Sequence, residues 1–239
     1  MATFSNFTNR LPDPNWGISE AGDGHATSFT EGPGFASVKF SSQQPVAYSR
    51  TNSGRVTTRA IAGQYWSIGI TYNPMTRDQF EPIYNFLLEK RGRLKPFFVA
   101  LPQHIDTRTT TSGTLSVQGT ITSGDTNFLI DGMDSISGVL RPGDMCNFVD
   151  SGNSNHHKIY KIVRVADSNN KLSSDTALNT SDERRLYVVP PVEKDVTDNS
   201  TLDYGSPLFR VVQKSDVQEY SLGTNNLYTF SLNLEEAQA

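Results

Sequence analysis

The chain has 239 residues and a mass of 26.4 kDa, which is enough for one large domain or two small ones with a proper hydrophobic core. Hydrophobic residues make up 36% and charged residues 19% of the sequence, both below their usual shares. Ser, Thr, Asn, Gln and Gly fill the difference. Together with 18 Gly and 12 Pro, this composition favours a β-rich protein with many turns and argues against a helical bundle.

The charge and cysteine content exclude several kinds of site. A single cysteine, Cys146, rules out an intrachain disulfide framework and a zinc or iron–sulfur site made of thiolates alone. The first ten residues lack the apolar segment of a signal peptide, and no stretch reaches the roughly 18 apolar residues of a membrane span. We therefore expect a soluble protein, folded in a reducing compartment, without membrane insertion. A net charge of −4 provides no overall basic field for nucleic acid.

The N-terminal third begins irregularly and then becomes strand-like. Residues 1–35 are rich in Pro, Gly, Asp and Asn and carry isolated aromatic residues, a pattern typical of an irregular arm. Short strands are expected at 38–40 and 55–62. Residues 65–72 alternate Trp, Ile, Ile and Tyr with Tyr, Ser, Gly and Thr, and a period of two over eight residues strongly indicates a strand.

One helix is predicted, over residues 76–90. Thr76 and Gln79 have the spacing of a capping box. Lys90 favours the C-terminal dipole, and Gly92 is placed for a left-handed stop. Pro82 deletes one backbone hydrogen bond and predicts a kink or a 3₁₀ first turn. The apolar stripe expected to face a sheet consists of Phe80, Ile83, Tyr84, Leu87 and Leu88.

The middle of the chain predicts a small β-barrel or sandwich. After an extended segment at 93–101, a polar linker begins at about residue 106 and a second polar run spans 193–204. Turn residues such as the Pro-Gly-Asp of 142–144 punctuate the region between them. About five short strands in this space are the number expected of a small barrel; they are predicted at 114–117, 127–130, 145–149, 158–165 and 184–190.

The last 33 residues contain two more predicted strands, 208–214 and 227–234. Two strands cannot build a core alone, because chains below about 40 residues rarely fold unaided. We expect them to hydrogen-bond into the sheet that contains residues 65–72. Residues 106–206 would then be an insertion into one discontinuous domain formed by 1–105 and 207–239.

The chain carries no catalytic signature. A G-x-S-x-G elbow, a phosphate-binding P-loop, an H-E-x-x-H helix and a G-x-G-x-x-G turn are all missing from the sequence. His156 and His157 are adjacent and would point to opposite faces of a strand, so we expect solvated loop histidines rather than a metal site. Cys146 is expected to be a small buried hydrophobe and not a nucleophile. We therefore predict no enzyme activity, no catalytic residue, no metal site and no cofactor.

Carboxylates and aromatic residues allow two further interpretations. Pairs such as Asp131 with Asp134, or Glu235 with Glu236, could serve glycoside hydrolysis, but a solvated turn and a solvated chain end are the favoured interpretation. The aromatic alternation in residues 65–72 could form a stacking platform for sugars or bases, but core packing is favoured because a helix follows directly.

The order of these features resembles tail-tip proteins of tailed bacteriophages, specifically the distal tail protein group, and is close to the minor tail proteins of lambda-like tail tips. The resemblance covers residues 55–105 and 140–236. In the first part it is carried by GQYWSIGITYNPMTRDQF at 63–80, IYNFL at 83–87, RGR at 91–93 and PFFV at 96–99. In the second part it is carried by LRPGDM at 140–145, KIYKIV at 158–163, YVVPP at 187–191 and YTFSLNLEE at 228–236.

The resemblance implies a fold and an assembly. The fold would be mainly β: a discontinuous, β-sandwich-like ring domain with one helix and an inserted small, OB-like β-barrel. The protein would be a structural virion protein at the tail tip or baseplate, made and assembled in the host cytoplasm. Its ring, a hexamer in the distal tail proteins, would join the tail tube protein to the baseplate hub and receptor-binding apparatus. The tape measure protein and DNA would pass through the lumen, the DNA without specific binding.

Two other hypotheses share some of these features. A trimeric tail-tip hub component would have the same strand–helix–strand pattern, and oligomer mass would separate it from a hexamer. A host carbohydrate-binding accessory module in 106–206 would need an exposed aromatic patch. The sequence offers five aromatic residues there, most of them at strand positions that pack: Phe128, Phe148, Tyr160, Tyr187 and Tyr204.

The N-terminal segment is the predicted assembly surface. A ring repeats one heterologous contact until it closes, and its donor should present apolar groups outside the protomer's own core. Phe4, Phe7 and Trp16 are apolar anchors without a period, and Pro12 and Pro14 keep the backbone extended. We expect these three aromatic residues to contact an adjacent subunit or a stacked ring; an unattached terminus is the alternative.

Overall fold

The computed structural model describes residues 9–13, 33–104, 106–109, 111–173, 178, 180–205 and 207–237. The chain divides into two compact units, a sheet unit that draws on residues up to 99 and on 210–237, and a barrel unit that draws on residues 100–209. Among the described residues there are fourteen strands and one α-helix, so the mainly β fold class predicted from the sequence is confirmed. No helix in this part of the chain is long and apolar enough to cross a membrane.

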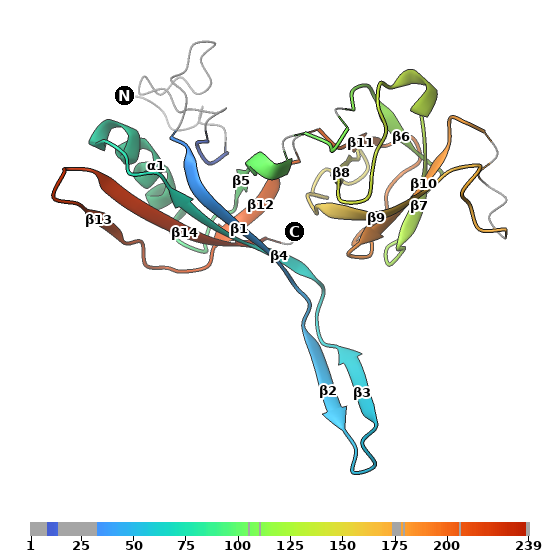
Figure 1. Ribbon diagram of the computed structural model, residues 1–239, viewed down its shortest axis with the longest axis horizontal. Helices are drawn as coiled ribbons and strands as arrows, with labels where there is room; N and C mark the ends of the chain where they lie inside the picture. Colours follow the sequence, from blue (N-terminus) through green and yellow to red (C-terminus); the bar gives the residue numbers. More distant parts are fainter. Residues whose placement is uncertain are drawn as a thin grey trace. The chain divides into compact units, whose positions relative to one another are not determined.

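The sheet unit is built on one curled sheet (Figure 1). Its order is β1 (Phe35–Gln43), β4 (Tyr65–Tyr72), β14 (Tyr228–Glu236), β12 (Phe209–Gln213) and β5 (Phe97–Val99), with β13 (Tyr220–Leu222) paired to β14. In the register, Leu232 of β14 lies opposite Ile70 of β4, and Val212 of β12 lies opposite Glu235. The prediction that the two C-terminal strands complete the sheet of residues 65–72 is therefore confirmed.

Alternation in β4 separates the two faces of this sheet. Trp66, Ile68, Ile70 and Tyr72 are each at most 3% exposed, whereas the residues between them are partly exposed. The aromatic alternation therefore packs in the core, as expected, and is not a stacking platform. The buried face is covered by α1 (Arg77–Lys90), which lies along β14 and β4 in Figure 1.

Helix α1 begins where the sequence predicts. The backbone N–H of Thr76 donates to Gln79 Oε1 at 3.3 Å, which is half of the predicted capping box. The ring of Phe80 stacks on that of Tyr228 with 4.6 Å between centroids. At the other end, Gln213 Nε2 donates to the Leu87 carbonyl at 3.1 Å. Both ends of the helix are thus attached to the sheet by residues distant in sequence.

The helix prediction holds in one detail and differs in two. Gly92 has the predicted left-handed backbone, with φ 64°, and Arg91 before it is also left-handed, with φ 55°. Pro82 lies within an unbroken α-helix, so the first turn is not 3₁₀. The buried stripe includes Phe86 and Lys90, whereas Leu88 is 49% exposed. The helix is therefore rotated toward Phe86 relative to the predicted stripe.

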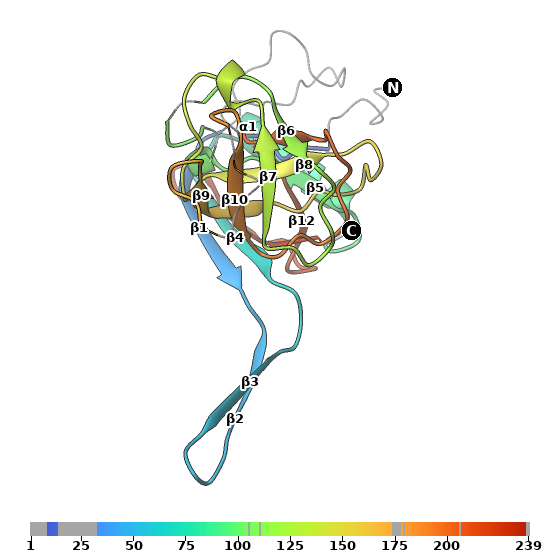
Figure 2. The ribbon, with the colours of Figure 1, turned by 90° about the vertical axis from the view of Figure 1, so that its right-hand side faces the viewer.

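A separate two-stranded hairpin connects β1 to β4. It consists of β2 (Val46–Arg50) and β3 (Val56–Ala60), paired from Val46 opposite Ala60 to Arg50 opposite Val56. Gln43 and Tyr65 form the last pair of β1 with β4, and the hairpin leaves the sheet beyond that pair. Figures 1 and 2 both show it as a narrow ribbon apart from the sheet.

The barrel unit is a closed six-stranded barrel. Its order is β10 (Arg184–Val189), β7 (Asn127–Asp131), β6 (Leu115–Gln118), β11 (Thr201–Asp203), β8 (Met145–Val149) and β9 (Tyr160–Ala166). All five strands predicted from the sequence are present, and the predicted small barrel is confirmed. The sixth, β11, was not predicted, because it lies in the polar run 193–204; it closes the barrel by pairing with both β6 and β8.

The barrel has its own hydrophobic core. Inward-facing residues of all six strands form one buried cluster, among them Leu115, Ile130, Cys146, Ile162, Leu186 and Leu202. Leu202 comes from the short β11 and is 2% exposed. A three-residue strand therefore contributes one core side chain and the hydrogen bonds that remove the open edge.

Candidate functional site

The hairpin β2–β3 has no hydrophobic core of its own. All ten of its strand residues are exposed. Val46 and Tyr48 alternate to one face of β2, and Val56, which lies opposite Arg50, joins them on that face. Tyr48 is 78% exposed. The hairpin therefore presents an apolar face that nothing among the described residues covers.

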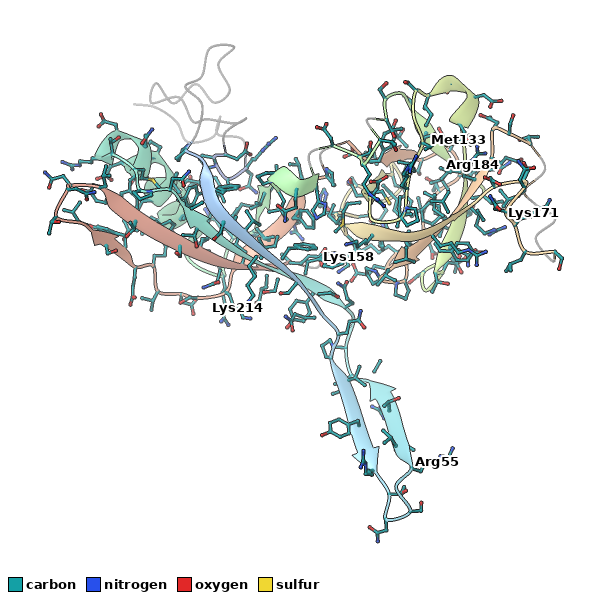
Figure 3. The ribbon with its side chains drawn as sticks, viewed as in Figure 1. Arg55, Met133, Lys158, Lys171, Arg184 and Lys214 are labelled. Carbon is teal, nitrogen blue, oxygen red and sulfur yellow. The ribbon has the colours of Figure 1, made fainter. Side chains whose placement is uncertain are left out.

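The hairpin is also basic. Arg50, Arg55 and Arg59 lie on it, and the sequence has no acidic residue between Glu31 and Asp78. Figure 3 shows Arg55 at the far end of the ribbon. An isolated two-stranded hairpin is at best marginally stable in water, and here Arg50 shares the face of Val46 and Tyr48.

Sequence reasoning predicted β3 but missed β2 and the hairpin. The signal was present: Val46 and Tyr48 alternate before Thr51-Asn52-Ser53-Gly54, and such a Ser, Asn and Gly cluster between two strand-like runs indicates a hairpin turn. The turn is closed by the Gly54 N–H, which donates to the Thr51 carbonyl at 2.9 Å, and Gly54 has φ 83°.

The predicted assembly residues Phe4, Phe7 and Trp16 lie outside the described residues. The short segment 9–13, between Phe7 and Trp16, pairs with β5 of the same chain. Leu11 N–H donates to the Phe98 carbonyl at 2.8 Å, and Phe98 N–H donates to the Asn9 carbonyl at 2.7 Å. This segment therefore extends the sheet beyond β5, and the contact of the three aromatic residues with a neighbouring subunit stays a prediction.

Cys146 and the adjacent histidines, His156 and His157, belong to the barrel unit. In the described part of the chain, no three His, Cys, Asp or Glu side chains gather where they could hold a metal ion. Cys146 is completely buried in the barrel core, and burial raises the pKa of its thiol. It is a buried hydrophobe, as predicted, because a thiol with a raised pKa is a poor nucleophile.

His156 does not fit the prediction of a solvated loop residue. It is 3% exposed, its Nε2 lies 2.6 Å from the Tyr160 hydroxyl, and its ring packs against Phe148 with 5.5 Å between centroids. Desolvation lowers the pKa of His156 to about 4. The Tyr160 hydroxyl also accepts the Glu193 N–H at 2.9 Å, so His156 helps to attach two loops to the barrel.

Acidification should weaken the barrel through His156. The pKa of His156 is about 4 in the folded chain, against 6.5 for an ordinary histidine, which stands for the unfolded chain. The free energy of unfolding is therefore unaffected by this group above pH 6.5, and it decreases as the pH falls from 6.5 toward 4, because the unfolded chain binds the proton more tightly. We expect the free energy of unfolding to decrease by about 1–2 kcal/mol over this range, less than the full pKa shift would give, because solvent screens part of the effect. Urea unfolding across this range measures it. His156→Gln should flatten the dependence, and an equally steep profile in that variant would contradict it.

The carboxylates of the two pairs lie in different surroundings. Glu236 is 6% exposed and its Oε2 accepts the Trp66 N–H at 3.1 Å, so the expectation of a solvated chain end is wrong for this residue. Asp131 is half-buried at the end of β7, where burial and then Asp182 raise its pKa. The nearby Asp134 N–H is capped by Asp182 at 2.8 Å. The carboxylates of Glu236 and Asp182 thus accept backbone N–H groups, and Asp134 Oδ2 accepts the Ser181 hydroxyl at 3.3 Å.

The aromatic residues of the barrel unit pack, as the sequence predicts. Phe128, Phe148, Tyr160 and Tyr204 are at most 6% exposed, and the Arg164 guanidinium lies over the half-buried ring of Tyr187 at 4.9 Å. A hollow of about 540 Å³ at residues 147–157 and 197–201 is lined mainly by Asn, Ser, Asp, Thr and His. It presents no exposed ring, so among the described residues the aromatic patch expected of a carbohydrate-binding module is missing.

Comparisons with known proteins give one consistent result. A family model described as distal tail protein pb9, A domain, N-terminal matches residues 23–104. The chain is also 28% identical over 163 residues to distal tail protein pb9 of Escherichia phage T5, a match that covers 67% of this chain and 71% of that protein. The matched range 23–104 includes β1, the exposed hairpin, β4, α1 and β5.

Proposed function

We propose that this chain, which belongs to the distal tail proteins of tailed bacteriophages and is a structural protein of the phage tail, closes into a ring at the tail tip. The ring would connect the tail tube to the baseplate or receptor-binding apparatus. The predicted domain of residues 1–105 with 207–239, which contains the sheet unit, is the ring-forming domain in this proposal, and residues 106–206 are an inserted domain on it. The protein acts through assembly and not as an enzyme.

The exposed hairpin carries the ring proposal. A ring repeats one heterologous contact, in which a donor surface of each subunit meets a different surface of the next. The hairpin suits the donor, because all ten strand residues are exposed and its apolar face would be covered only in the assembled ring. The hairpin is also basic, with three arginines and no acidic residue, whereas the whole chain has a net charge of −4. In a ring, a basic hairpin would be attracted to the acidic surface of the next subunit.

The remaining partners follow from the place of such a ring in a tail. One face would meet the tail tube protein and the other the baseplate hub, with the tape measure protein and DNA passing through the lumen. A hexamer is proposed; a trimeric hub component is the alternative. Assembly of the ring would take place in the host cytoplasm before the tail joins the virion.

Removing the hairpin tests the ring proposal without touching the core. Gln43 and Tyr65 are the last paired residues of β1 and β4, so replacing residues 44–64 with Asn-Gly should leave a two-residue turn of the type that suits antiparallel strands. We expect the protomer to unfold at nearly the same temperature while the ring is lost. Mass photometry gives the oligomer mass, and calorimetry gives the melting temperature.

A matched pair of point variants guards against a folding artefact. Tyr48→Ser removes the most exposed ring of the apolar face, and Thr57→Ser changes a residue of the opposite face. Tyr48→Ser should weaken the ring and Thr57→Ser should not. A shortened chain that still forms the full ring would overturn the role of the hairpin, and a trimer mass in the unmodified protein would favour the hub alternative.

A further inference from the structure

The sheet face opposite α1 carries small polar side chains. Because cross-strand partners share a face, the register defines rows that run across β1, β4 and β14. One row is Lys39, Gly69 and Asn233. The next is Ser41, Ser67 and Glu235. Lys214 follows β12, and its N–H donates to the Asn233 carbonyl at 2.9 Å, which places Lys214 at the end of the first row.

The first row encloses a hollow. Gly69 has no side chain, and a Cβ at this position would meet Asn233 Oδ1 at 3.4 Å and the Lys39 Cβ at 3.6 Å. The hollow above it has a volume of about 440 Å³. Its lining consists of Lys39, Ser41, Gln43, Ser67, Gly69, Lys214, Ser215 and Asn233. Every side chain that lines it is polar, and none is acidic.

Two lysines form its opposite walls. Lys39 and Lys214 are both exposed, and among the described residues neither forms an ion pair. Lys214 is labelled in Figure 3. The two strands that carry them are separated by β4 and β14, about 14 Å at ordinary strand spacing, so two long flexible stems can bring their ammonium groups toward one point between them.

We propose that this lysine hollow, defined by Lys39, Gly69, Lys214 and Asn233, binds a phosphate group. Lysine binds phosphate as a point charge. The Asn233 amide oxygen lies over Gly69, so this amide has to turn over for its NH₂ group to donate to the anion. The acidic residue in the neighbouring row is Glu235, which repels an anion only from one side. A tetrahedral group with oxygens in several directions suits donors that approach from two walls of a hollow.

Such a phosphate could come from a free phosphate ion or from a phosphodiester of nucleic acid. The proposed contacts are to phosphate and not to base edges, so binding to nucleic acid would be independent of base sequence. Only this second source rests on the proposed function, since DNA would meet the hollow only where this face lines the lumen. The hollow itself belongs to one protomer and does not depend on ring closure.

Lysine footprinting on the full chain tests the site at any oligomer size. Acetylation rates of Lys39, Lys214 and the exposed Lys95 are measured by mass spectrometry with inorganic phosphate, with a short duplex DNA and with neither. We expect Lys39 and Lys214 to react several-fold more slowly with at least one probe and Lys95 to be unchanged. Protection by phosphate indicates a free-ion site, and protection by DNA alone indicates a phosphodiester contact.

Three variants separate a site from general charge. In fluorescence anisotropy with the same duplex, Lys39→Gln with Lys214→Gln should reduce the slope of log K against log salt by about 0.9, because the two lysines together neutralise one phosphate. Lys95→Gln is the control and should reduce it less. Gly69→Val fills the hollow, keeps both lysines and suits a strand; it should abolish the protection by phosphate or DNA.

The proposal is overturned if neither probe protects Lys39 and Lys214, or if Gly69→Val leaves their protection intact. The oligomer mass of each variant is measured alongside. A chain that fails to form rings but shows the protection would remove the proposed function and leave the phosphate site standing. A chain that forms rings but shows no protection would remove the phosphate site and leave the proposed function standing.

Discussion

Replacing Phe80 with alanine should lower the free energy of unfolding of the sheet unit by about 3–5 kcal/mol. The side chain is 1% exposed, and its ring has four aromatic neighbours: Tyr84, Tyr220, Tyr228 and Phe230. Alanine would leave a cavity that these large rings cannot all move to fill, and it would detach the helix from β14. Urea unfolding followed by near-ultraviolet circular dichroism measures both effects.

Leu88→Ala is the matched control on the same helix. Leu88 is 49% exposed, so the same truncation should cost well below half as much as at Phe80. If the two variants were equally destabilised, α1 would bury the stripe predicted from the sequence and not the one that the structure has.

This difference shows how far periodicity can predict a helix. Capping residues and the i, i+3, i+4 spacing predict the extent of α1, because both depend on neighbours along the chain. They do not decide between Phe86 and Leu88, since a stripe more than a hundred degrees wide admits either. The sheet decides it: the loop after β12 packs on the last turn of the helix, where Gln218 Nε2 donates to the Leu87 carbonyl.

The strands that were missed are those whose pattern depends on a partner. Strand β11 has three residues and contributes Leu202 to the barrel core, a signal too short to stand out in a polar run. Strand β2 is exposed on both faces, so burial does not impose the period of two that made β4 easy to predict. Pairing in space defines β11, whereas β2 leaves a weak local signal, the alternation of Val46 and Tyr48 before the turn residues 51–54.

Net charge likewise could not predict the two basic surfaces, the hairpin and the lysine hollow. The net charge of −4 averages over the whole chain and hides the stretch 32–77, in which all charged side chains are basic. Lys39 and Lys214 are 175 positions apart in the sequence and share one row only because β14 joins β4. The sequence showed the aromatic residues of the N-terminal segment, Phe4, Phe7 and Trp16. It did not show that the hairpin β2–β3 leaves the sheet with all its strand residues exposed.

Excising residues 106–206 should leave a sheet unit that folds on its own. In the sheet order, β5 and β12 are neighbours, so a short Gly/Ser linker can join the two ends of the cut. The barrel strands pair only with one another and surround their own buried cluster. We therefore expect the shortened chain to unfold cooperatively and residues 106–206 alone to give a second cooperative transition, both measured by calorimetry.

The oligomer mass of the shortened chain extends this test to assembly. If the sheet unit forms the ring, the shortened chain should give the same number of subunits as the full chain, because its hairpin and sheet edges are intact. A folded but monomeric sheet unit would move the ring contact to the barrel. Loss of cooperative unfolding in both pieces would mean that the two units share one core, since a closed barrel with its own buried cluster has no other reason to fail when it is released.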